Sequence, residues 1–210
     1  MIRNFFALFV LLALLSACSK QKTNQQTSSE NYFNLSVGNY WVYEVYKIEN
    51  GVATNTNTVD SCFVEKDTLI HENTFAVISK PMSQGVPAQR QLFRDSSGYL
   101  VNPEGRVYFN QHSADEVLNS YFFILSNQDS VAFIDERMMP SSITILPAGS
   151  FHTKNMRIRY DMFPNHAGGG KQRDMHFKYA LGVGLVSETL PFYHNQPYVF
   201  ERRLLRYHVK

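Results

Sequence analysis

Cysteine and histidine are the side chains of this sequence that could act as nucleophiles or metal ligands, so their spacing decides which chemistry is open to it. The histidines form no i, i+4 pair and no HExxH motif, so we expect scattered surface and turn positions rather than a metal site. Only a hairpin could bring His166 and His176 together, with His152 on the neighbouring strand. The chain of 210 residues has two cysteines, and its histidines stand at positions 71, 112, 152, 166, 176, 194 and 208.

Cys62 is predicted to be a small buried side chain and not a catalytic thiol. It lies in a strand-like stretch where alternation puts it on one face with Asp60 and Val64. A catalytic thiol needs a base placed beside it, and none stands near Cys62 in the sequence. The other cysteine, Cys18, belongs to an N-terminal motif with its own chemistry, so Cys62 also lacks a disulfide partner.

The second thiol, Cys18, closes an N-terminus built like an export signal. A cationic start is followed by an apolar run over residues 5–15, which at about 11 residues is too short to span a bilayer as a helix. Leu15-Ser16-Ala17-Cys18 resembles the lipobox of bacterial lipoproteins. That resemblance implies that residues 1–17 are a signal peptide, that the Cys18 thiol is joined to diacylglycerol, and that the new amine carries an acyl chain such as palmitate. The alternative is an ordinary secretory signal with an incidental cysteine.

Residues 18–31 are predicted to be a flexible acylated tether. Between Ser19 and Glu30 there is no aliphatic or aromatic side chain, so this stretch cannot bury enough surface to order itself. Retention at the inner membrane in the lipoprotein family requires an acidic residue after the cysteine, and Ser19 is not acidic. Lys20-Gln21-Lys22 lacks the acids of a surface-export signal. The resemblance therefore implies an outer-membrane anchor on the periplasmic face.

The charge balance argues against a nucleic-acid partner. The formal net charge is +2, and removal of Arg3 with the signal peptide leaves 19 basic against 18 acidic residues. Nucleic-acid binding would need a basic face. Arg202, Arg203 and Arg206 form a local basic cluster, but strand alternation splits them between two faces. We expect a solvated edge there and not an anion site.

Two further motifs have structural interpretations. The segment 166–171 (HAGGGK) is glycine-rich, yet Gln172 and the strand-like flanks exclude a phosphate-binding P-loop, so we expect a hairpin loop. Ser113 and Glu116 have capping-box spacing, which predicts about two helical turns there with Asp115 in the first turn. The apolar stretch 121–125 could extend that helix or form a strand, and we favour the strand. No GxSxG hydrolase motif is present.

The remaining sequence is rich in strand signals. Tyr40–Ile48 is aromatic and β-branched after the Gly38-Asn39 turn signal, and Trp41 is expected to anchor the core. About ten such stretches follow one another with turn residues between them. We predict a mainly β protein, with a single antiparallel curved sheet, half-barrel or sandwich and one short helix, over a single β-rich domain at residues 32–210.

Three motifs carry a family resemblance. Gly38-Asn39-Tyr40-Trp41-Val42-Tyr43, Pro147-Ala148-Gly149-Ser150-Phe151 and the stretch 179–186 (YALGVGLV) are similar to those of uncharacterised lipoproteins from Bacteroidota-type bacteria. The resemblance covers most of the mature domain and concerns turns and strands. It implies a fold family and no catalytic residue, cofactor or metal ligand.

The sequence therefore predicts a membrane-anchored envelope lipoprotein that is not an enzyme and binds a partner or an apolar ligand on its curved sheet. An accessory subunit of an envelope complex is the alternative, and an envelope hydrolase using Cys62 or a histidine cluster is a third. The abundant aromatic side chains could fill a core or line a groove. A deep apolar pocket would favour ligand binding, and an exposed flat apolar patch would favour the accessory role.

The lipobox can be tested directly by mass spectrometry of the protein isolated from its native membrane. We expect an acylated Cys18 as the first residue, and loss of both lipid and membrane retention in a Cys18→Ser variant. A longer unmodified N-terminus in the native protein would contradict the assignment.

Overall fold

A computed structural model describes residues 31–126, 128–193 and 195–210. The predicted signal peptide, the lipidation site Cys18 and the predicted tether up to residue 30 lie outside the described residues. Twelve strands and one short helix make up the fold. They are β1 (Tyr40–Glu49), β2 (Val52–Ile70), β3 (Asn73–Lys80), β4 (Gln89–Ser96), β5 (Tyr99–Val101), β6 (Val107–Asn110), β7 (Val117–Ile124), β8 (Ser130–Leu146), β9 (Gly149–Met162), η1 (Pro164–Gly169), β10 (Gln172–Ala180), β11 (Gly184–Thr189) and β12 (Tyr198–His208).

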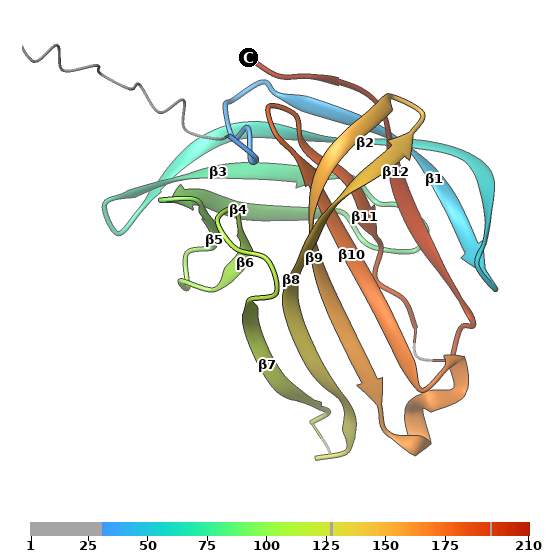
Figure 1. Ribbon diagram of the computed structural model, residues 1–210. Coiled ribbons are helices and arrows are strands. Elements are labelled where there is room, and N and C mark those ends of the chain that lie inside the picture. The colour runs from blue at the N-terminus through green and yellow to red at the C-terminus, as the bar shows by residue number, and fades with distance from the viewer. Residues whose placement is uncertain (1–30, 127, 194) are drawn as a thin grey trace, which may run out of the picture.

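All twelve strands belong to one antiparallel sheet. Its order is β6-β5-β4-β3-β2-β1-β12-β11-β10-β9-β8-β7. Each strand therefore pairs with its neighbours in the chain, except that β6 and β7 form the two edges, and β1 pairs with β12 (Figure 1). The sheet curls until its two edges approach each other, where the Asn119 side chain donates a hydrogen bond to the Val107 carbonyl across 3.2 Å. The predicted mainly β fold with a curved antiparallel sheet is confirmed.

Turn residues at the strand ends explain the meander. Asn50 and Gly51 between β1 and β2 both have positive φ, of 52° and 76°, as a tight hairpin turn requires. The same holds for Ser97 and Gly98 between β4 and β5, with φ of 53° and 86°. These local signals fix where each strand reverses, and hence which side chains face the interior.

The helix predicted after Ser113 is wrong. Asp115 has a positive φ of 62°, and its amide donates to the Met138 carbonyl at 2.9 Å while the Met138 amide donates to the Glu116 carbonyl at 2.9 Å. Pairing with β8 therefore overrides the capping signal, and residues 121–124 form the second half of strand β7 as predicted. A 3-10 helix, η1, stands where a loop was expected. No described helix is long and apolar enough to cross a membrane.

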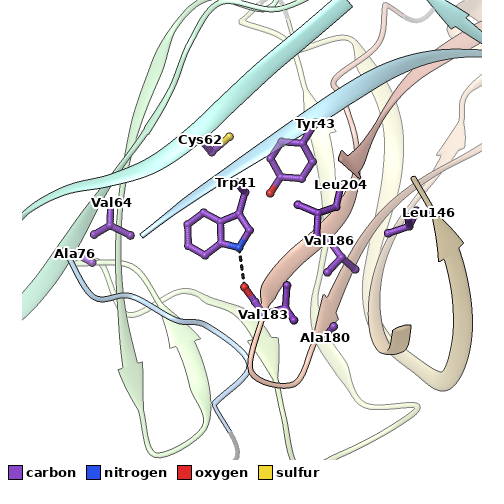
Figure 2. Close-up of a cluster of buried hydrophobic side chains, with 10 residues drawn as sticks. All are labelled: Trp41, Tyr43, Cys62, Val64, Ala76, Leu146, Ala180, Val183, Val186 and Leu204. Atoms are coloured by element: carbon purple, nitrogen blue, oxygen red, sulfur yellow. Dashed lines mark hydrogen bonds between the residues drawn. The ribbon is translucent and has the colours of Figure 1, made fainter. Parts of the chain in front are cut away.

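The core lies on the inner, concave face of the sheet. Trp41 is 3% exposed and its Nε1 donates to the Val183 carbonyl at 2.6 Å (Figure 2), which confirms Trp41 as a core anchor. The segment before β1 also enters the core. The Asn31 side chain accepts hydrogen bonds from the amides of Phe33 and Asn34, and this turn directs the Phe33 ring edge-on against Phe109 at 5.7 Å.

Two glycines in one loop give a matched pair of variants. A Cβ on Gly184 would lie 3.0 Å from Cζ2 of Trp41, whereas a Cβ on Gly182 would meet nothing within 4 Å, and both residues have positive φ. We expect Gly182→Ala to cost about 1–2 kcal/mol of unfolding free energy through backbone strain. Gly184→Ala should cost about 3 kcal/mol or more because overpacking is added. Urea unfolding monitored by Trp41 fluorescence measures both, and equal costs would contradict this packing.

Candidate functional site

An apolar cavity lies inside the curl of the sheet. Its volume is about 130 Å³, and its walls come from strands of both halves of the sheet and from the segment before β1. Most of the wall is aliphatic or aromatic, as in small-molecule sites that rely on apolar contact. The apolar wall residues include Phe33, Leu35, Trp41, Ile78, Phe93, Met156, Phe177 and Leu185.

The polar atoms in this wall fall into two groups. The first is already satisfied by backbone: Trp41 Nε1 donates to Val183, and the Tyr43 hydroxyl donates to the Leu185 carbonyl at 2.8 Å. These two rings therefore present only apolar surface to the cavity. The second group is Lys80, Gln91 and the hydroxyls of Tyr108 and Tyr179, with Lys80 as the one charged side chain of the described wall.

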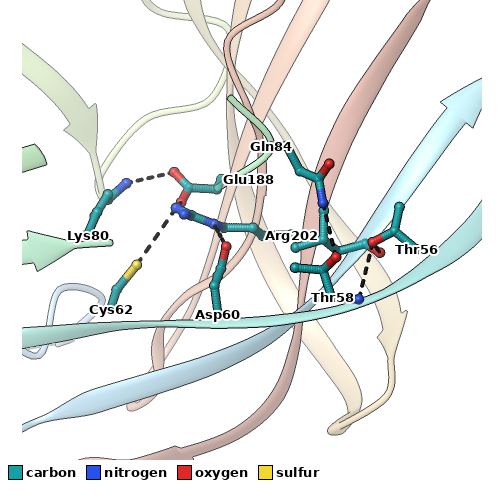
Figure 3. A network of polar contacts seen from close by, with 9 residues as sticks. Thr56, Thr58, Asp60, Cys62, Lys80, Gln84, Glu188 and Arg202 are labelled. Atoms are coloured by element: carbon teal, nitrogen blue, oxygen red, sulfur yellow. Dashed lines mark hydrogen bonds and ion pairs between the residues drawn. The ribbon is translucent and has the colours of Figure 1, made fainter. Parts of the chain in front are cut away.

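Lys80 belongs to a buried cluster of charged side chains (Figure 3). Its Nζ lies 2.7 Å from Glu188 Oε2, and the other oxygen of Glu188 lies 2.7 Å from Arg202 Nη1. Arg202 Nε in turn lies 2.9 Å from Asp60 Oδ2. Arg202, Glu188 and Asp60 side chains are exposed by only 3%, 4% and 6%. Two cations and two anions thus balance in the interior.

The cluster keeps Glu188 ionised despite its burial. Burial alone raises the pKa of this carboxyl, but the charges of Lys80 and Arg202 and their hydrogen bonds outweigh burial and lower the pKa below its ordinary value of 4.5. A carboxyl whose pKa is lower in the folded chain than in the unfolded chain stabilises the fold above its unfolded pKa. That contribution disappears as the pH falls through the folded pKa.

Cys62 forms part of the cavity wall as a buried thiol. It is 2% exposed, in agreement with the sequence prediction. Burial raises its pKa to about 12, so the thiol stays protonated near neutral pH, where a thiol is a weak nucleophile. Its Sγ lies 3.8 Å from Arg202 Nη1.

The histidines do not gather into a site in the described chain. His166 Nε2 lies 2.8 Å from Asp129 Oδ2, and His176 Nδ1 lies 3.0 Å from the Asn155 side-chain nitrogen. His152 is exposed on β9. Over residues 31–126, 128–193 and 195–210, no three His, Cys, Asp or Glu side chains are grouped as a metal would require. His194 lies outside the described residues.

The burial of Arg202 differs from what its sequence position predicts. Arg202 was expected at a solvated edge, and this is wrong because Glu188 and Asp60 neutralise it in the interior. Arg203, the next residue, lies on the other face with 26% of its side chain exposed. The available signal was alternation, which puts Arg202 on the same face as the core residue Leu204.

A passage with both polar and apolar wall residues adjoins the cavity beside this cluster. It has a volume of about 100 Å³ and shares the Lys80, Gln91 and Phe177 side chains with the cavity wall, and Glu188 and Arg202 also line it. A wider hollow of about 310 Å³ follows between the β3–β4 and β11–β12 connections. The passage and the hollow share the wall residues Val86, Pro87, Gln89 and Pro191.

The contribution of this charged cluster to stability can be measured with a variant of Arg202. Arg202→Met should cost about 3–5 kcal/mol of unfolding free energy because Glu188 and Asp60 lose their shared cation inside the fold. The matched control Arg203→Met removes a half-buried pair with Glu201 and should cost less than about 1 kcal/mol. Denaturant unfolding at pH 7 compares them. Similar small losses for both variants would show that the cluster is not the stabilising unit described above.

No family model matches the chain, and no curated protein matches it. Among solved structures, a protein from Bacteroides fragilis with a YmcC-like fold, named as exported, is similar with a TM-score of 0.50 and 12% identity, over 84% of this chain and 98% of its own. A protein from Parabacteroides distasonis, named as a lipoprotein, has a TM-score of 0.48 and 14% identity over the same shares of the two chains. At 12% identity, the similarity to the Bacteroides fragilis protein shows a shared fold alone, and that fold is YmcC-like.

Proposed function

We propose that this chain is a lipid-anchored lipoprotein of the bacterial envelope that is not an enzyme and binds an apolar ligand inside its half-barrel. The observation that carries the proposal is the cavity of about 130 Å³ on the inner face of the sheet. A fully packed core would leave no such space. An engineered apolar cavity of about 150 Å³ admits benzene, so this one has room for a ring or a short stretch of acyl chain.

The anchor and location follow from the N-terminal motif. Acylation at Cys18 would hold the protein on the membrane, since several acyl chains at about 0.8 kcal/mol per CH₂ bind far more firmly than one. Ser19 favours the outer membrane, and the absence of acidic residues from Lys20-Gln21-Lys22 favours its periplasmic face. The Bacteroides fragilis protein of similar fold is named as exported, which agrees with an envelope location.

A binding role without catalysis fits the groups around the cavity. Cys62 is buried and its pKa is raised to about 12, so it does not offer a ready thiolate. Lys80 and Glu188 are engaged with each other, and Arg202 is engaged with Glu188 and Asp60. The described wall thus offers shape and apolar contact together with a few hydrogen-bond donors.

Strand β7 supports a second candidate, the accessory subunit. It is an edge strand, paired with β8 alone among the described strands, and it carries no charge. Phe122 and Ile124 are 59% and 52% exposed. Exposed apolar edges of this kind accept an added strand from a partner, so docking on an envelope complex is the role left if the cavity binds nothing.

Ligand binding can be tested through Trp41, which lines the cavity and is the sole tryptophan of the chain. We expect 8-bromo-1-octanol to quench its emission saturably in the acylated full chain held in lipid nanodiscs, because bromine quenches on contact. Ile78→Phe fills the cavity and should abolish the saturable quenching.

The matched control is Ile145→Phe, at a side chain 81% exposed on β8, which should bind like the wild type. Linear, non-saturating quenching that is the same in wild type and Ile78→Phe would mean that the probe acts from the lipid alone. The apolar-ligand proposal would then fail, and the accessory role would stand.

A further inference from the structure

We propose that the ligand is a single-chain amphiphile with a carboxylate head, held by Lys80 and Gln91 where the cavity meets the passage, with its tail in the cavity against Trp41. This inference rests on the proposed function, because it names the chemical class of the ligand for the same cavity. It is carried by the hydrogen-bonding groups that the wall leaves unused.

Lys80 is the charged group that a ligand in the cavity would meet. Its side chain is 14% exposed, and one of its three N–H donors is directed at Glu188 Oε2 across 2.7 Å. Within the described residues this is the one hydrogen bond of the ammonium, so its two remaining donors are open to an acceptor from water or a ligand. Most of the cavity wall is apolar, which makes a charge-assisted hydrogen bond strong.

The Glu188 carboxylate does not give the cavity a preference for a cationic head group. Both of its oxygens are occupied, one by Lys80 and the other by Arg202 at 2.7 Å. It lines the passage and is absent from the cavity wall. A cationic head in the cavity would therefore meet the Lys80 ammonium first, while each oxygen of Glu188 is already bonded to a cation of the protein.

Two neutral hydrogen-bond donors in the cavity wall, Gln91 and Tyr179, also favour a carboxylate head group. Gln91 is paired with Ile78 across β3 and β4, so its side chain is a diagonal neighbour of Lys80 on the inner face of the sheet. In the described chain neither the Gln91 amide nor the Tyr179 hydroxyl makes a side-chain hydrogen bond, and both line the cavity. A carboxylate has two oxygens and about four acceptor sites, which suits an ammonium and an amide together.

The two ends of the site differ as an amphiphile requires. Beyond Lys80 the wall of the passage carries Gln89, Glu188 and Arg202 among apolar side chains, and it shares residues with the wall of the outer hollow, so a head group there lies beside polar side chains. On the other side of Lys80 the wall is formed by Ile78, Phe93 and Trp41. A tail placed there gains apolar burial, while its carboxylate remains at the ammonium.

The test compares three probes with one tail and different heads, in the acylated full chain in nanodiscs at pH 7. They are 8-bromooctanoate, 8-bromo-1-octanol and 8-bromooctyl-trimethylammonium, and the readout is the saturable quenching of Trp41. We expect the carboxylate to bind about tenfold or more tightly than the alcohol, as a charge-assisted hydrogen bond provides, and the cation to bind more weakly than both.

Variants then assign the effect to Lys80. Lys80→Met should bring the carboxylate down to the affinity of the alcohol, while Lys80→Arg should keep the preference. Lys66→Met removes an exposed lysine of β2 and should change neither probe. The wild-type comparison needs no substitution, so it decides the matter even where Lys80→Met disturbs folding through Glu188.

The outcomes separate this inference from the proposed function. If carboxylate and alcohol bind equally in the wild type and Ile78→Phe abolishes both, the apolar cavity is a binding site and the head-group assignment is overturned. If none of the probes quenches saturably, the proposed function fails as well. A preference for the carboxylate that survives in Lys80→Met would also overturn the role of Lys80.

Discussion

The pairing of the first strand with the last is the constraint on which the rest of the structure depends. Strands β1–β6 and β7–β12 are two runs of local hairpins, and they become one sheet only where β1 hydrogen-bonds to β12, from Tyr40↔His208 to Glu49↔Tyr198. The cavity wall takes side chains from both runs. Without this long-range contact neither half could enclose it, since each half alone is an open ribbon with an unburied apolar face.

The buried charges reinforce the same join. Asp60 and Lys80 come from β2 and β3, whereas Glu188 and Arg202 come from β11 and β12. A buried ion pair gives little net stability compared with apolar packing. It does require that its partners meet, because a shifted register would leave a charge alone in the interior. We interpret the cluster as a device that fixes how the two halves align, beside the hydrogen bonds of β1 and β12.

What could be predicted from the sequence was local. The strand around Trp41 and the burial of Cys62 each follow from neighbouring residues and alternation, and both are confirmed. The prediction of a helix after Ser113 failed because Asp115 and Glu116 hydrogen-bond to a partner strand, β8, instead of forming a helical turn.

The site was less visible because its parts are far apart in the chain. Arg202 and Asp60 are separated by 142 residues, and no pattern within one strand reveals such a pair. Alternation could have placed Arg202 on the inner face, but not the carboxylates that make its burial tolerable. A cavity is a packing defect among side chains from many strands, so it cannot be predicted from composition or periodicity.

The way the chain enters its fold has a mechanical consequence. The Asn31 carbonyl accepts a hydrogen bond from the Gly182 amide at 2.9 Å, and two residues later the Phe33 ring is both packed on Phe109 and part of the cavity wall. A pull on the chain from its N-terminal side is thus loaded onto one hydrogen bond and then onto the lining of the cavity. A pulling force on the chain and a ligand in the cavity would both act on the Phe33 ring. A filled cavity would therefore resist unfolding that starts at the N-terminal side of the domain.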